Sequence, residues 1–221
     1  MNGEEQHDVV IVGGGAAGVN CALECFDIQL DTILVEAGAT LGGQLPEILH
    51  SVRNVAAGRF ADGLALQRAL LESAEILGDR VRLSHPVTTA DVGARAIEVD
   101  GARLSGRALV VATGTRKQYL DAAPDGGFGG DITYQLEPVL SHFAGRDVAV
   151  IGGGDSGSLD ALELARRGSS VKLIHRSPDL TARQDILRLV HDQPRIEDLA
   201  GWELEAAHGA ERLESIVLMR S

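Results

Sequence analysis

DVVIVGGGAAG at residues 8–18 and DVAVIGGGDSG at residues 147–157 are two glycine-rich turns of one design within a chain of 221 residues. Each turn follows a short apolar run and precedes a stretch whose apolar residues recur at helical spacing. A buried strand, a G-x-G-x-x-G turn and a helix form the fingerprint of a dinucleotide-binding βαβ unit. The sequence therefore predicts two such units, and two dinucleotides in one chain indicate electron transfer between them.

The expected elements make the chain an α/β protein with two Rossmann-like, three-layer ββα domains. The glycine- and proline-rich stretch at 116–130 is the expected boundary, which gives domains at 1–117 and 118–221. Helices are expected at 16–27, 60–77, 156–167 and 185–190, a loop at 38–51, and strands at 8–12, 32–35, 81–83, 87–89, 96–99, 108–112, 147–151, 170–174, 203–207 and 213–219.

The residue that ends the second strand of such a unit, about 20 residues after the turn, contacts the ribose. In the first unit this residue is Glu36, whose carboxylate suits the ribose hydroxyls of FAD or NAD. In the second unit it is His175, followed by Arg176, and a guanidinium there favours the 2′-phosphate of NADP. The plainer alternatives are a solvated strand-end charge for Glu36 and an ordinary surface arginine for Arg176.

Composition excludes one class of partner and places the protein among soluble proteins. The formal net charge is −12 and aromatic residues make up 3%, so the basic face and stacking residues of a nucleic-acid binder are missing. No apolar run reaches the ~20 residues of a membrane helix, and residues 1–7 are polar and acidic, unlike a leader. We expect no membrane partner and a cytoplasmic location.

Two cysteines, Cys21 and Cys25, stand one turn apart on the expected first helix. They are either a redox pair or two small side chains that pack the helix against the sheet. We favour packing, because free cysteine is among the most frequently buried residues.

Five segments together resemble the thioredoxin reductase group of two-dinucleotide flavoproteins. The segments are DVVIVGGGAAG (8–18), LGGQL (41–45), VRNVAAG (52–58), VVATGT (110–115) and DVAVIGGGDSG (147–157), and the similarity spans almost the whole chain. The resemblance implies FAD on the first unit, NADPH on the second and a homodimer.

Carried over by position, the resemblance implies a set of cofactor-binding residues and names no catalytic residue and no metal ligand. The set for FAD is Gly13, Gly15, Ala16, Ala17, Gly18, Glu36, Ala37, Gly42, Gly43, Gln44, Asn54, Val87, Ala112, Thr113 and Gly114. The set for the nicotinamide dinucleotide is Gly152, Gly154, Asp155, Ser156, Gly157, His175, Arg176 and Arg183.

Three departures from the family pattern change the expected chemistry. Gln135 and Pro138 replace the two thiols of the family's Cys-x-x-Cys, so thioredoxin reduction by that route is excluded unless a partner brings thiols. The His-Arg-Arg-x-x-x-Arg clamp keeps only one arginine, Arg176, with Arg183 as partial compensation, which leaves the choice between NADPH and NADH open. The resemblance also implies a further segment that completes the FAD domain after residue 221, so the sequence is either part of a longer chain or that of a naturally shortened protein.

These observations favour an FAD-dependent, NAD(P)H-linked oxidoreductase that passes electrons from flavin directly to an external acceptor. Ferredoxin, flavodoxin, a quinone, a small disulfide and oxygen all stay open as acceptors. His142, near the lost thiols, is a candidate proton donor, although a packing or surface role is favoured. The alternatives are a non-catalytic flavoprotein that acts as a sensor, scaffold or subunit, and a flavin oxidase that uses no NAD(P)H.

Overall fold

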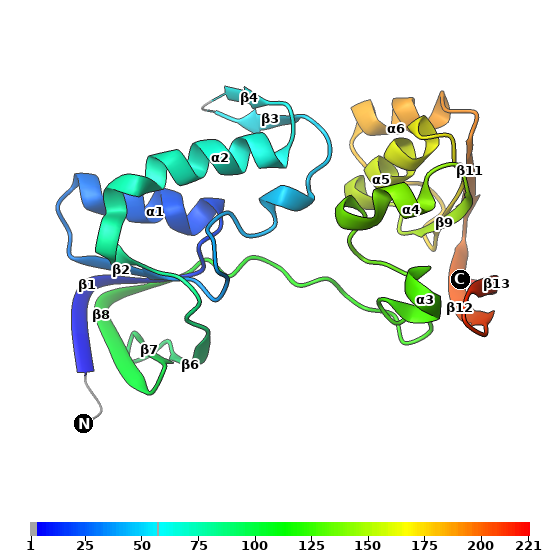
Figure 1. Ribbon diagram of the computed structural model, residues 1–221. Coiled ribbons are helices and arrows are strands. Elements are labelled where there is room, and N and C mark those ends of the chain that lie inside the picture. Colours follow the sequence, from blue (N-terminus) through cyan, green and yellow to red (C-terminus); the bar gives the residue numbers. More distant parts are fainter. Residues whose placement is uncertain (1–3, 57) are drawn as a thin grey trace. The chain divides into compact units, whose positions relative to one another are not determined.

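The computed structural model describes residues 4–56 and 58–221 and divides the chain into two compact units (Figure 1). The units are Met1–Arg116, here unit 1, and Lys117–Ser221, here unit 2. This division falls one residue before the boundary expected from the sequence. Ala57, within the segment at 52–58 that carries part of the family resemblance, lies outside the described residues.

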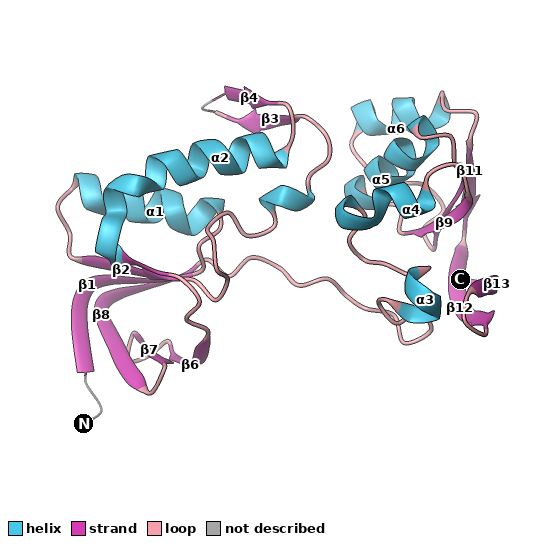
Figure 2. Ribbon diagram, viewed as in Figure 1, coloured by secondary structure: helices cyan, strands magenta, loops and turns pink. Residues whose placement is uncertain are grey.

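Unit 1 is built on a six-stranded sheet with the order β5-β2-β1-β8-β7-β6. The strands are β1 (Glu4–Val12), β2 (Thr32–Val35), β5 (Val81–Arg82), β6 (Val87–Asp91), β7 (Ala96–Val99) and β8 (Ala102–Val111). The first four in the order are parallel, whereas β7 and β6 continue the sheet antiparallel. Figure 2 shows helices α1 (Ala16–Asp27) and α2 (Gly63–Ala74) over one side of the central strands, with β6 and β7 on the other.

Both faces of β1 are buried over residues 9–12, which explains the uninterrupted apolar run there. Val9 and Ile11 pack with Val19, Leu70 and other residues of the two helices. On the opposite face the alternate residues of β1 pack with residues of β2, β7 and β8; this cluster comprises Val10, Val12, Ile33, Val35, Ile97, Val99 and Leu104. The alternation of side chains along a strand therefore supplies two cores from one segment.

Several elements of unit 1 differ from the sequence expectation. β1 begins at Glu4 rather than residue 8, because its polar half pairs along β8 from Arg103 to Gly106. Residues 38–51 contain a short 3-10 helix, η1 (Leu45–Glu47), and they lead into a hairpin of β3 (Val52–Val55) and β4 (Gly58–Phe60) that was not expected. The helix expected over 60–77 is α2, which continues as the 3-10 segment η2 (Glu75–Arg80).

Unit 2 holds a three-stranded parallel sheet with the order β11-β10-β9. The strands are β9 (Asp147–Ile151), β10 (Ser170–His175) and β11 (Ile196–Ala200), with helices α5 (Asp155–Arg166) and α6 (Gln184–His191). β11 was not expected, since its sequence IEDLA has no continuous apolar run. The remaining elements are α3 (Gly127–Gly130), η3 (Glu137–Val139), α4 (Leu140–Phe143) and the antiparallel pair β12 (Trp202–Gly209) and β13 (Leu213–Arg220).

The parallel strands in both units, with their crossover helices, confirm the predicted α/β class. Among the described residues, none of the helices has both the length and the apolar character needed to span a bilayer.

Candidate functional site

The first glycine turn joins β1 to α1 and is closed by backbone contacts that only glycine permits. Gly13 has φ +106°, and a Cβ atom there would lie 2.4 Å from the carbonyl oxygen of Ala112. A Cβ atom on Gly18 would lie 1.9 Å from the carbonyl oxygen of Gly13. Gly15 is different, because nothing lies within 4 Å of the position of its missing Cβ. The turn is therefore tight at Gly13 and Gly18 and open beside Gly15.

Both helices that follow the glycine turns begin without a side-chain cap. Gly15 caps α1 and Gly154 caps α5, and neither cap offers a side-chain hydrogen bond. By contrast, the carboxylate of Asp62 accepts the N–H of Ala65 at 2.7 Å at the start of α2. The first N–H groups of a helix lack intrahelical acceptors and favour an anion. The two uncapped starts are thus fitted to phosphate groups, whereas α2 is already satisfied.

Glu36 lies directly after β2 and brings its carboxylate to the first turn. One oxygen accepts the N–H of Gly14 at 2.5 Å and the other accepts the N–H of Gly38 at 2.6 Å. The sequence count to Glu36 therefore places a carboxylate beside the turn, where the ribose hydroxyls of a dinucleotide are expected.

The loop at 41–44 is attached to the same turn. The N–H of Gly42 donates to the carbonyl of Gly14 at 2.8 Å, and the position of a Cβ on Gly43 lies 3.4 Å from the Cα of Gly15. The side-chain amide of Gln67 on α2 also holds this loop, because it donates to the carbonyl of Leu41 at 2.7 Å.

Most of the remaining residues predicted to bind FAD lie around the ends of β1, β2 and β8. The amide of Gln44 donates to the carbonyl of Thr115 at 2.7 Å, and the N–H of Ala112 donates to that of Val12 at 2.8 Å. The segment before Val87 is joined to β2 by the N–H of His85, which donates to the carbonyl of Glu36 at 3.0 Å. Ala37 is exposed after β2, and Asn54 is exposed on β3.

The second glycine turn repeats this geometry between β9 and α5. Gly152 has φ +127°, and a Cβ atom on Gly157 would lie 2.0 Å from the carbonyl oxygen of Gly152. The space beside Gly154 is open, since the nearest atom to its missing Cβ is Oγ1 of Thr181 at 3.9 Å. Asp155 and Ser156 open α5 directly after it.

The three basic residues predicted at the second turn have different surroundings. His175 is buried, and its Nε2 lies 2.7 Å from Oδ1 of Asp198. Its side chain packs against Gly153 and does not line the open space beside Gly154. Arg176 is exposed, with no partner among the described residues. Nε of Arg183 lies 2.8 Å from Oδ2 of Asp155, an ion pair that the sequence did not indicate because 28 positions separate the two residues.

Gln135 and Pro138, which we expect at the positions of the family's two thiols, are both exposed, and Pro138 lies in the 3-10 segment η3. His142 on α4 is bound through Nε2 to Oδ1 of Asp131 at 2.8 Å. Arg212 donates to both oxygens of Asp131, at 2.6 and 2.7 Å, and this pairing together with the His142 contact holds the pKa of Asp131 far below its usual range. His142 is thus a member of a structural cluster.

Both cysteines lie against the core of unit 1. Cys25 is buried within the cluster between α1 and the sheet, and Cys21 packs against that cluster. Burial, and secondarily the neighbouring Cys25, raises the pKa of the Cys21 thiol, which disfavours the reactive thiolate. This is the packing role favoured from the sequence.

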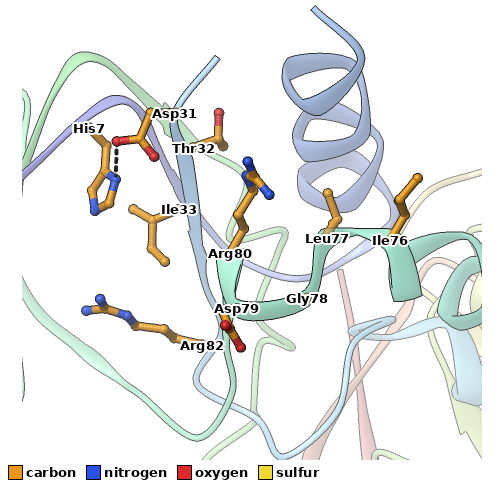
Figure 3. Close-up of a pocket in the computed structure, with 10 residues that line it drawn as sticks. All are labelled: His7, Asp31, Thr32, Ile33, Ile76, Leu77, Gly78, Asp79, Arg80 and Arg82. Atoms are coloured by element: carbon orange, nitrogen blue, oxygen red, sulfur yellow. Dashed lines mark hydrogen bonds and ion pairs between the residues drawn. The ribbon is translucent and has the colours of Figure 1, made fainter. Parts of the chain in front are cut away.

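A pocket of about 400 Å³ lies at the opposite end of β2 from Glu36 (Figure 3). Its lining includes His7, whose Nδ1 lies 3.0 Å from Oδ2 of Asp31, and Arg82, which pairs with Glu5 at 2.5 Å. The charges of Arg82 and Glu5 neutralise each other, and none of the predicted site residues lines the pocket. It is therefore separate from the first glycine turn.

Known proteins are similar to this chain over most of its length. The chain is 29% identical to a bifunctional thioredoxin reductase/thioredoxin of Mycobacterium leprae, covering 93% of this chain and 45% of that protein. It is 28% identical to a ferredoxin–NADP reductase of Picrophilus torridus, covering 96% of this chain and 66% of that protein. The chain thus spans about half to two thirds of the length of these curated relatives.

A solved structure agrees with the fold. The crystal structure of Lactococcus lactis thioredoxin reductase superimposes with a TM-score of 0.85 at 27% identity, over 97% of this chain and 71% of that chain. Residues 7–197 match the family described as pyridine nucleotide-disulphide oxidoreductase. Since this match includes both glycine turns and most of both units, the chain belongs to the pyridine nucleotide-disulphide oxidoreductase family.

Proposed function

We propose that this protein is an FAD-dependent, NAD(P)H-linked oxidoreductase that works without an internal redox disulfide. The observation that carries the proposal is the pair of uncapped helix starts at Gly15 and Gly154, each on a tight glycine turn within a βαβ unit. Membership of the family supports the two cofactors, FAD and a nicotinamide dinucleotide.

Unit 1 is the proposed FAD site. The open side of Gly15 leaves room for the pyrophosphate against the first N–H groups of α1, and Glu36 offers a carboxylate for the ribose. Gly42 and Gly43, held against the turn, are proposed to border the flavin ring together with Gln44. When bound, FAD supplies the two-electron redox chemistry of the site.

Unit 2 is the proposed nicotinamide site. It repeats the tight turn and the uncapped helix start, but no carboxylate corresponds to Glu36, since the equivalent position is the buried His175. Arg176 is exposed and has no partner among residues 4–56 and 58–221, which leaves a positive charge available to a 2′-phosphate. These features favour a nicotinamide dinucleotide over a second flavin at this turn.

We propose direct electron transfer from flavin to an external acceptor, because no cysteine stands at the positions of the family's redox pair. The chain has only two cysteines, and both lie on α1 in contact with the core of unit 1. Gln135 and Pro138 cannot carry electrons. Relatives named ferredoxin–NADP reductase support an acceptor of the electron-carrier class. We further propose a cytoplasmic homodimer.

The proposal is tested by anaerobic reduction of the full chain reconstituted with FAD. We expect NADPH or NADH to bleach the flavin absorption band at a rate that saturates with nucleotide concentration. A flavin that binds but is bleached by neither nucleotide would favour a sensor or an oxidase. A chain that binds no flavin would favour a scaffold and would refute the proposal.

A further inference from the structure

An acidic side chain stands at the second glycine turn, where an anion is expected. Asp155 is the first residue of α5, directly after the capping Gly154, and its side chain is 42% exposed. A helix start favours one negative group near its free N–H groups. A second negative group at the same place repels the first, so an uncompensated Asp155 would oppose the binding of a pyrophosphate.

Arg183 compensates this charge. Its Nε lies 2.8 Å from Oδ2 of Asp155, and its backbone N–H donates to Oδ1 of Asp155, also at 2.8 Å. Arg183 is the N-cap of α6, and the preceding loop is fastened to the turn by the N–H of Thr181, which donates to the carbonyl of Gly153 at 2.8 Å. The guanidinium is thus directed to the pyrophosphate end of the turn.

We propose that Arg183 is a positioning residue that neutralises Asp155 and so permits the pyrophosphate of any nicotinamide dinucleotide to bind at the second turn. Arg183 then contributes equally to NADH and NADPH binding. Discrimination between the two nucleotides falls to Arg176, which is exposed and has no partner among the described residues. This inference rests on the proposed nicotinamide site and revises the expectation that Arg183 belongs to the 2′-phosphate clamp.

The test measures dissociation constants of NADH, NADPH and ADP with the full chain by equilibrium titration at low and high ionic strength. Because both partners are about half exposed, we expect Arg183→Gln to weaken all three ligands by the same factor, about two- to fivefold. The effect should shrink at high salt, as expected for screened charges. Arg183→Lys should restore binding, since it keeps the charge. Arg176→Gln should weaken NADPH alone.

The decisive variant is the double substitution Arg183→Gln with Asp155→Asn. Removing both charges should return all three affinities to nearly wild-type values, whereas a purely structural role of the pair would leave the double variant as weak as the single one. Arg167→Gln is the matched control, because Arg167 pairs with Glu163 at 3.0 Å on the same helix, away from the turn. It should change nothing.

Two kinds of failure are distinguishable. A wild-type chain that binds none of the three ligands would overturn the nicotinamide site itself, and this inference with it. If the wild-type chain binds the ligands, three results for Arg183→Gln would overturn the role of Arg183 alone. These results are a selective loss of NADPH affinity, unchanged affinity for all three ligands, and no rescue by Asp155→Asn. Melting curves of every variant separate loss of folding from loss of binding.

Discussion

At the scale of single residues, the glycines of the first turn serve two separate purposes. Gly13 and Gly18 allow the chain to close, because a side chain at either position would collide with backbone atoms. Gly15 has open space beside it and leaves the helix start accessible. Folding and cofactor binding can therefore be tested separately within six residues.

We predict that Gly18→Ala and Gly15→Ala have different effects on stability. The Cβ of Gly18→Ala would meet the carbonyl oxygen of Gly13 at 1.9 Å, so the free energy of unfolding should fall by about 1–3 kcal/mol, the usual cost of overpacking. Gly15→Ala meets no atom and should change stability by less than about 1 kcal/mol. Urea denaturation of the two cofactor-free variants measures both values.

We predict that Gly15→Ala weakens flavin binding without unfolding the protein. Gly15→Ala places a methyl group in the open space of the turn, so we expect FAD affinity to fall by about tenfold or more although the protein remains folded. A fully stable Gly15→Ala variant with wild-type affinity for FAD would show that the open side of the turn is not the binding surface.

Single residues also mark the limits of sequence analysis. Glu36 could be predicted, because its place after β2 follows from the regular spacing of a βαβ unit. The Asp155–Arg183 pair could not, since it depends on how the loop before α6 folds back on the glycine turn. The burial of His175 was likewise hidden, because its partner Asp198 lies on the unexpected strand β11.

At the scale of elements, apolar runs were the reliable signal. β2 and α1 have the predicted bounds, since their residues face the core. Backbone pairing holds three segments that were not predicted: the polar half of β1, the start of β8, and the hairpin of β3 and β4. Such pairing produces no periodic pattern of apolar residues in the sequence. The polar half of β1 pairs with β8, distant in the chain, whereas β3 pairs with the adjacent β4; neither pairing requires an apolar pattern in the sequence.

One tyrosine organises the first segment of unit 2. The hydroxyl of Tyr134 donates to the carbonyl of Ala123 at 2.9 Å and accepts the N–H of Leu120 at 2.8 Å. We predict that Tyr134→Phe lowers the free energy of unfolding of unit 2 by about 1–2 kcal/mol and speeds proteolysis between residues 116 and 135. The control is Tyr119→Phe, whose ring is exposed; equal proteolysis of both variants would contradict the role of the hydroxyl.

The Asp131 cluster should make unit 2 sensitive to acid. Its pairing with Arg212 and His142 holds the pKa of Asp131 below the ordinary value of 3.8, so the folded state favours the charged carboxylate. The resulting stability is present above about pH 4 and is lost as the pH falls further. Melting curves of wild type should therefore drop more steeply below this pH than those of Asp131→Asn, which should be less stable at pH 7.

The exposed Asp121 provides the comparison for this pH experiment. Asp121→Asn should retain the wild-type pH dependence and the wild-type melting temperature at neutral pH. An Asp131→Asn variant that follows the wild-type curve throughout would show that the cluster does not stabilise the fold.

At the scale of the whole molecule, two dinucleotide units occur in a chain with two cysteines, both on α1 in contact with the core. We predict that Cys21→Ala with Cys25→Ala leaves the anaerobic rate of flavin reduction by NAD(P)H unchanged. The melting temperature should fall, because Cys25 is buried. A thiol-free chain that folds and binds FAD but cannot be reduced would show that the cysteines carry electrons.

The most direct test of the account is the binding of FAD to the full chain. Titration of the purified protein with FAD, followed by flavin fluorescence and equilibrium dialysis, should give one bound FAD per chain, with much weaker binding in Gly15→Ala. A folded wild-type protein that stays colourless and binds no FAD at any concentration tested would contradict the central claim that the first glycine turn is a flavin site.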